Sequence, residues 1–196
     1  MISRVLLIRA LINFQCAQLL WHRGINSLND SKALSQALLA KIEEQIERLS
    51  YLITLIPEDS TEWQPVNDSM RVCDLLGHQL ETLAGFCAVL HRLYPDHLSH
   101  FASLREREVN HCCGIEEARQ RIQDYRSCIE EGFALMTDED LSRLLPTIFV
   151  SEGETILTLL LGNLEHLINH KYQLFFYLKL LGVRVSTPDL YHLRGM

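Results

Sequence analysis

The sequence lacks the features that mark several large functional classes. No apolar run reaches the roughly 18–20 residues that a membrane-spanning helix needs, so we expect no membrane partner. Basic residues are outnumbered: 18 Lys and Arg stand against 25 Asp and Glu, and the formal net charge of -7 argues against a nucleic-acid partner. There is no glycine-rich phosphate loop and no alternation of strands and helices. Gly77 and Gly85 are therefore expected to permit close packing of helices and not to bind phosphate.

The six cysteines show no Cys-x-x-Cys spacing, and no secretory signal accompanies them. We therefore expect neither a zinc knuckle nor a disulfide scaffold, and a reducing, cytoplasmic location is the simpler interpretation. The vicinal pair Cys112 and Cys113, beside His111 in a predicted loop, leaves a redox or metal-binding role open. Three other cysteines fall within helical patterns, where a thiol usually acts as a small apolar side chain: Cys73, Cys87 and Cys128.

The first thirty residues differ from the rest of the chain. No acidic residue precedes Asp30, whereas Arg4, Arg9 and Arg23 lie among many Leu and Ile residues. This pattern resembles a weak amphipathic targeting segment, but it has no small-residue cleavage pattern. An additional helix packed on the domain, or an over-long start to the reading frame, is the favoured interpretation. We expect an N-terminal extension over residues 1–30 and a single domain over residues 31–196.

Apolar residues recur every three or four positions in four stretches after Asp30, which is the pattern of amphipathic helices. Four such helices joined by medium-length connections predict an all-α four-helix bundle, in which metal ligands project inwards from facing helices. The short apolar stretch Leu144–Val150 is expected to be an extended piece or a lid. The predicted helices span about residues 38–56, 68–95, 115–136 and 151–181.

Local signals predict where these helices begin and end. Pro57 ends the first, because proline lacks an amide donor. Asp68 or Ser69 is expected to cap the start of the second. Residues 151–154 (Ser-Glu-Gly-Glu) have the form of a capping box that opens the fourth helix. Gly182 then supplies a residue that can adopt a left-handed conformation just beyond its end.

Two histidines in the last predicted helix have the spacing of metal ligands. His166 and His170 lie four residues apart, so their Cβ atoms share one helical face roughly 5–6 Å apart. Both imidazoles can then turn a nitrogen towards one ion, at about 2.0–2.1 Å for zinc. His78, on the apolar stripe of the second helix, can complete the set and leave coordination positions open for water or substrate. The other histidines after residue 30 are expected in loop or surface positions: His91, His97, His100, His111 and His192.

Several short motifs, in order, carry a family resemblance. Trp63-Gln64-Pro65 in the connector, residues 72–78 ending at His78, and residues 166–173 continuing through 177–183 together resemble the DinB-like (DinB/YfiT) superfamily of metal-dependent enzymes. The resemblance covers about residues 34–184. It implies one metal-ligating histidine from the second bundle helix and two, four residues apart, from the last. These roles fall on His78, His166 and His170.

Two residues depart from the family's pattern. Tyr172 stands where many members carry glycine, and Lys171 stands where a further histidine is frequent. Neither removes a proposed ligand, but the bulky Tyr172 ring could narrow the open face of the metal or change what binds there. Gln173 is expected to support the structure by a hydrogen bond to a neighbouring loop or helix.

The resemblance implies a metal-dependent enzyme, with thiol S-transferase activity as its main theme. In that reaction a divalent ion binds a low-molecular-weight thiol and favours the nucleophilic thiolate. The residues themselves support the metal more directly than the transfer. A metal-dependent hydrolase can use the same three histidines, and a non-catalytic metal-binding helical dimerisation module is the further alternative. Neutral imidazoles suit zinc, nickel and iron alike, and a homodimer remains an open expectation.

No general base can be identified from the sequence. Glu152 and Glu154 lie at the expected start of the last helix, where a carboxylate also suits the helix dipole. Glu165 is adjacent to His166 and therefore points about 100° away from it.

Overall fold

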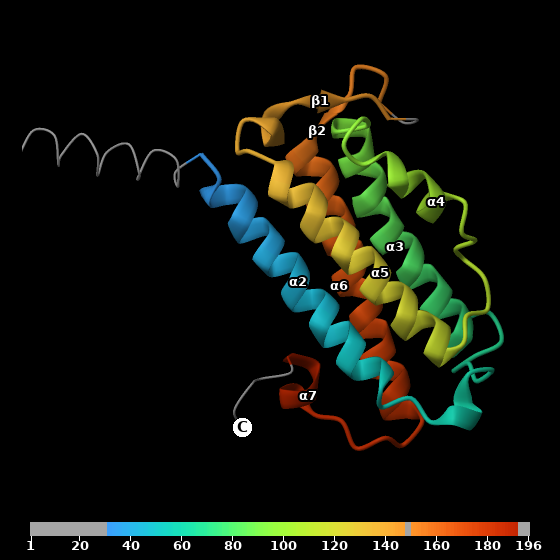
Figure 1. The fold of residues 1–196 in the computed structure, drawn as a ribbon. Helices are drawn as coiled ribbons and strands as arrows, with labels where there is room; N and C mark the ends of the chain where they lie inside the picture. The colour runs from blue at the N-terminus through green and yellow to red at the C-terminus, as the bar shows by residue number, and fades with distance from the viewer. Residues whose placement is uncertain (1–30, 148–149, 192–196) are drawn as a thin grey trace, which may run out of the picture.

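The computed structural model describes residues 31–147 and 150–191, which form a helical bundle with a short hairpin (Figure 1). The long helices are α2 (Ala33–Ile53), α3 (Val72–Leu93), α5 (Ile115–Leu135) and α6 (Ile156–Leu180). The short helical elements are η1 (Glu58–Ser60), η2 (Ser99–Phe101), α4 (Ala102–Arg105), η3 (Asp140–Ser142) and α7 (Thr187–Tyr191). The predicted N-terminal extension, residues 1–30, and His192 lie outside the described residues.

The four long helices surround one apolar core. α3 packs against α5 and α6, and α2 packs against the same two helices. The inward stripes predicted from the sequence are buried, as Ile42 and Ile46 of α2 and Leu80 of α3 illustrate with no exposed surface. Each such side chain stabilises the fold by roughly 1.5–3 kcal/mol through its removal from water. The all-α bundle is therefore confirmed, and none of the described helices is long and apolar enough to cross a membrane.

The start of α3 differs from the prediction. Neither Asp68 nor Ser69 caps this helix, which begins at Val72. Instead, the carbonyl of Trp63 accepts the Val72 amide at 2.9 Å, so part of the connector satisfies a donor of the first turn. The Ser69 hydroxyl turns back and donates to the carbonyl of Val66 at 2.7 Å. The connector is thus folded onto the N-terminal end of α3.

The start of α6 also differs from the prediction. Glu154–Thr155 form β2, which pairs antiparallel with β1 (Leu144–Leu145), and α6 begins only after this pair. Gly153 has a φ of 92°, a left-handed conformation that suits a hairpin turn and not a helix. Thr155 caps α6 instead, since its hydroxyl oxygen accepts the amide of Thr158 at 3.1 Å. The apolar stretch after residue 143 is therefore in part an extended strand.

The end of α6 matches the prediction. Gly182 has a φ of 81°, and its amide donates to the carbonyl of Lys179 at 3.1 Å. The amide of Val183 donates to the carbonyl of Leu178 at 2.9 Å, which completes a Schellman motif. Figure 1 shows α7 at this end of the bundle and the β1–β2 hairpin at the opposite end.

Candidate metal centre

The three histidines predicted as ligands meet between α3 and α6. Nε2 of His78 lies 3.0 Å from Nε2 of His166 and 3.1 Å from Nε2 of His170. The potential ligand atoms of all three lie within 4.8 Å of one another. In a tetrahedral site with bonds of 2.0–2.1 Å, two ligating nitrogens are separated by about 3.3–3.4 Å. A small outward shift of the rings therefore suffices for all three to reach one ion.

The hydrogen bonds of two of these rings, His78 and His170, indicate which nitrogen carries the proton. Nδ1 of His78 lies 2.7 Å from the amide oxygen of Asn110 and 3.0 Å from a carboxylate oxygen of Glu81. Nδ1 of His170 lies 2.8 Å from the amide oxygen of Gln173. Oxygens of these types only accept, so each Nδ1 donates and each Nε2 is left with a lone pair. Unprotonated nitrogens that face one another at this distance, each backed by an oxygen acceptor, are the donor set that a divalent cation requires.

The surroundings also favour neutral imidazoles. Partial burial lowers the pKa of His166, and the neighbouring His78 adds to this effect. Burial likewise lowers the pKa of His170, and the hydrogen bond to Gln173 opposes it only in part. A neutral ring is the form that ligates metal. Geometry and electrostatics therefore agree that these three residues could hold a divalent metal ion.

Comparison with known proteins supports the fold. No family model and no curated protein matches the sequence. Among solved structures, a DinB-like protein of Bacillus subtilis, YjoA, superposes with a TM-score of 0.58 at 21% sequence identity. The match covers 74% of this chain and 92% of that chain. This chain has the DinB-like fold.

In this chain, one of the three histidines lies on α3 and two lie on α6, which is the distribution that the family resemblance implied. At this level of identity the likeness extends to the fold, so the chemistry of the site rests on the contacts of the residues themselves.

Gln173 supports the centre in a different way from the one predicted. Within the part of the chain that the structure describes, its two hydrogen-bond partners both lie on α6: its amide oxygen holds Nδ1 of His170, and its amide nitrogen donates to the hydroxyl of Tyr177 at 2.9 Å. The Trp63 ring then packs edge-on against the ring of Tyr177, with centroids 5.5 Å apart. The connector before α3 thus buttresses a histidine of α6 through two intervening side chains.

The two residues that depart from the family's pattern face away from the histidines. Lys171 is buried against α2, and its ammonium group donates to the side-chain oxygen of Gln45 at 2.8 Å. Tyr172 lines a groove of about 370 Å³ together with Lys171 and Gln45, and its ring packs edge-on against Phe176. The expectation that Tyr172 narrows the open metal face is therefore wrong. Tyr172 lies two residues beyond His170, so its side chain points out from the opposite side of α6.

A loop that follows α4 supplies Asn110, one of the two acceptors for His78. Asn110 has a φ of 58°, and its amide donates to the carbonyl of Gly77 at 3.2 Å. A Cβ atom at Gly77 would lie 2.0 Å from the carbonyl oxygen of His111, so only glycine lets this loop lie against α3. Gly77 therefore accommodates a loop and not a helix, whereas Gly85 faces Asn163 of α6 and permits helix packing as predicted.

Sequence reasoning missed two acceptors of His78. Glu81 lies three residues beyond His78 on α3, and helical spacing alone was a sufficient signal for it. Asn110 is separated from His78 by 32 residues and lies on an irregular loop, so no spacing rule indicated it. The other described histidines stay outside the centre; His100 and His111, for example, pair with Glu131 and Glu117.

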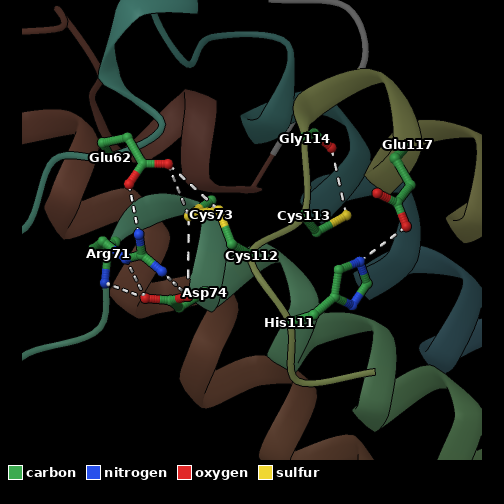
Figure 2. The surroundings of a disulfide bond; sticks show 9 residues. All are labelled: Glu62, Arg71, Cys73, Asp74, His111, Cys112, Cys113, Gly114 and Glu117. Carbon is green, nitrogen blue, oxygen red and sulfur yellow. Dashed lines mark hydrogen bonds and ion pairs between the residues drawn. A yellow bond between two sulfur atoms is a disulfide. The ribbon is translucent and has the colours of Figure 1, made fainter. Parts of the chain in front are cut away.

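The expectation that Cys73 acts as a small apolar side chain is wrong, because Cys73 takes part in a disulfide. Cys73 and Cys112 form a disulfide, with Cα atoms 4.6 Å apart, at the N-terminal end of α3 (Figure 2). The loop carries Cys112 against α3 here, because the amide of Cys113 donates to the carbonyl of Cys73 at 3.0 Å. Cys113 itself is buried with a free thiol, and burial raises its pKa to about 12. Cys87 is buried in the core as a small apolar side chain, as predicted.

Proposed function

We propose that this chain is a metal-dependent enzyme that holds one divalent ion, Zn, Ni or Fe, between His78, His166 and His170. The observation that carries this proposal is the convergence of three Nε2 atoms, with the opposite nitrogens of His78 and His170 held by oxygen acceptors. Acceptors placed in this way orient the rings and make the ligating nitrogens more basic.

The reaction that we propose is the transfer of a low-molecular-weight thiol to an electrophile. A divalent ion in this centre binds the thiol and favours its thiolate, which is the nucleophilic form. Three protein ligands leave further coordination positions open to such a molecule. The three rings are only partly buried, so a small molecule can approach them from outside the bundle.

The protein's own residues orient the ligands and limit their protonation. Gln173 and Tyr177 fix the ring of His170, and Asn110 and Glu81 fix the ring of His78. The carboxylate of Glu81 also places a negative charge beside His78, which offsets part of the positive charge of a bound ion.

Two of the carboxylates considered from the sequence, Glu154 and Glu165, are not among the described partners of the three histidines. Glu165 is exposed on α6. Glu154 lies in β2, before Ile156, the first residue of α6. Ile156 is ten helical positions from His166, which corresponds to about 15 Å along the helix axis. A hydrolase that uses the same histidines therefore lacks an evident base among these residues, and we favour thiol transfer over hydrolysis.

Two measurements test the proposal together. The metal content of purified protein is measured for the wild type, for His170→Ala and for His91→Ala, which changes a histidine of α3 outside the centre. Conjugation of a small thiol to a model electrophile is then followed with and without added divalent metal. When the metal content is measured with the Cys73–Cys112 disulfide intact, we expect one ion per chain in the wild type and in His91→Ala only. Metal-dependent conjugation should follow the same pattern. Metal-dependent ester hydrolysis without conjugation would favour the hydrolase, and metal without either activity would favour the non-catalytic module.

A further inference from the structure

A second cluster of metal-ligand atoms lies at the N-terminal end of α3. The carboxylate of Glu62 places Oε1 3.7 Å from Sγ of Cys73 and 3.4 Å from Sγ of Cys112. These three residues come from the connector before α3, from its first turn and from the loop after α4 (Figure 2). This cluster shares no residue with the histidine centre, although Cys73 and His78 both lie in the N-terminal turns of α3.

Arg71 orients the carboxylate of this cluster. One of its terminal nitrogens lies 2.5 Å from Oε2 of Glu62, and its Nε lies 2.7 Å from Oδ2 of Asp74. The guanidinium group therefore occupies one oxygen of Glu62 and leaves Oε1 directed at the two sulfurs (Figure 2). Cys73 is almost fully buried, whereas Cys112 and Glu62 are exposed. One side of the cluster is thus open to solvent.

The distances suit a small tetrahedral site. With a metal–sulfur bond of 2.3 Å and a metal–oxygen bond of 2.0–2.2 Å, the sulfur and oxygen ligands are separated by about 3.5–3.7 Å. The observed separations of 3.7 and 3.4 Å are close to this value. Only the two sulfurs are too close, because they are bonded to each other. Reduction frees Cys112, and rotation of its exposed side chain separates the sulfurs while Glu62 keeps its place.

We infer that reduction of the Cys73–Cys112 disulfide creates a second divalent-metal site, in which two thiolates and the Glu62 carboxylate bind a thiophilic cation such as zinc. Two molecules of a low-molecular-weight thiol supply the two electrons: they are oxidised to their own disulfide, and Cys73 and Cys112 become thiols. The cation then displaces the two thiol protons to solvent. The oxidised and metal-bound states exclude each other, because the same sulfur electrons form either the disulfide or the metal bonds.

The local charges favour a dication. The reduced cluster carries four negative charges, one on each of two thiolates and one each on Glu62 and Asp74. Arg71 carries one positive charge, so the net charge is -3. Soft thiolate ligands select zinc over magnesium or calcium, which prefer sets of oxygens. The site therefore differs from the histidine centre in its ligand chemistry.

Cobalt binding to the full chain tests this inference. Thiolate-to-Co²⁺ charge transfer absorbs in the near ultraviolet, and a centre made only of histidines gives no such band. We expect the band in protein reduced with a phosphine, and none in oxidised protein. It should disappear in Cys73→Ser and in Cys112→Ser and persist in Cys113→Ser, the matched control for a neighbouring thiol. Glu62→Gln should weaken cobalt binding by about tenfold or more.

His170→Ala separates this inference from the proposed function. It should keep the thiolate band, because the histidines do not contribute to the second site. Loss of metal from the histidine centre with retention of the band would support the second site independently of the proposed function. A band that persists in both cysteine variants would overturn the inference of a second site.

A second measurement covers variants that fail to fold. In reduced wild-type protein, zinc should slow alkylation of the exposed Cys112 by iodoacetamide at least about tenfold, as followed by peptide mass spectrometry. Equal alkylation rates with and without zinc would overturn the inference.

Discussion

His78 and His170 point Nε2 atoms at each other across 3.1 Å, and Nδ1 of each ring donates to an oxygen on its far side. When both rings are neutral, the two facing nitrogens are therefore both acceptors. Two lone pairs at this distance repel each other unless a positive charge lies between them. The folded chain accordingly contains a local electrostatic cost that a bound cation removes.

The first prediction concerns the ligands themselves. In protein with the Cys73–Cys112 disulfide intact, His166→Ala and His170→Ala should each abolish stoichiometric zinc, because two remaining imidazoles hold the ion weakly. Helical content should stay near that of the wild type, since the buried apolar stripes hold the bundle. Zinc at 100 times its Kd should stabilise the wild type by about 2.7 kcal/mol and these variants hardly at all. Thermal unfolding with and without zinc measures this, and His91→Ala should behave as the wild type does.

The second prediction concerns the acceptor on the loop. Asn110→Gly removes the amide that holds Nδ1 of His78 and keeps a residue that tolerates a φ of 58°. Zinc affinity should fall by about 10–100-fold, as is typical when an outer-shell partner of a ligand is lost. Competition with a chelator of known affinity measures the change. An unchanged affinity would show that Glu81 alone orients the ring.

The third prediction compares two glycines. Gly77→Ala places a methyl group 2.0 Å from the carbonyl oxygen of His111, so the loop must move, and we expect a loss of stability of about 1–3 kcal/mol with weaker zinc binding. Gly162→Ala on α6 meets no atom within 4 Å and should stabilise the fold by roughly 0.5–1 kcal/mol. Urea denaturation compares the two. Equal effects of the two substitutions would contradict the close contact at Gly77.

The fourth prediction identifies the nucleophile. The double variant Cys112→Ser, Cys113→Ser should keep thiol conjugation within a few-fold of the wild type, because the added small thiol is the proposed nucleophile. Steady-state rates at matched metal content measure this. Complete loss of conjugation with metal still bound would assign the reaction to a protein cysteine.

The fifth prediction is a pH dependence of stability. Burial opposes the ionisation of Asp140, but hydrogen bonds from the Thr137 amide and hydroxyl and from Tyr94 outweigh it and lower the pKa to about 2. A carboxylate with a lowered pKa stabilises the fold above the ordinary value of 3.8 and loses this contribution as the pH falls towards 2. Near neutral pH, the free energy of unfolding of the wild type should exceed that of Asp140→Asn by on the order of 2 kcal/mol.

The same comparison at low pH supplies the control for Asp140. Urea denaturation of both proteins between about pH 6 and pH 2 should show the difference shrinking as Asp140 is protonated. A difference that stays constant over this range would mean that Asp140 acts through its shape and not its charge.

Much of the fold and the ligand set follow from helical periodicity. The spacing of His166 and His170 is a property of one helix, and His78 lies on the stripe that faces it, so local rules sufficed. The start of α6 was predicted wrongly because residues 151–154 and Thr155 offer competing caps. The left-handed φ of Gly153, which depends on the hairpin, decides between them.

The partners of the site were less accessible to sequence reasoning. Asn110 and Cys112 reach α3 only because the loop between α4 and α5 folds back onto Gly77. No periodic pattern governs that path, and the contact joins residues more than thirty positions apart. Long-range loop contacts of this kind depend on tertiary packing, which a local reading of the sequence does not contain.

The disulfide also has a topological consequence. Cys73 and Cys112 are 39 positions apart, and the bond closes the chain between them into a covalent ring. Such a ring removes conformational freedom from the unfolded chain that is worth about 4 kcal/mol in a chain-entropy model. His78 and both of its acceptors, Glu81 and Asn110, lie inside this ring, whereas the two histidines of α6 lie outside it. When α3 and α6 separate, His78 and its two acceptors therefore remain tethered as a unit, and reassembly of the centre requires only that α6 return.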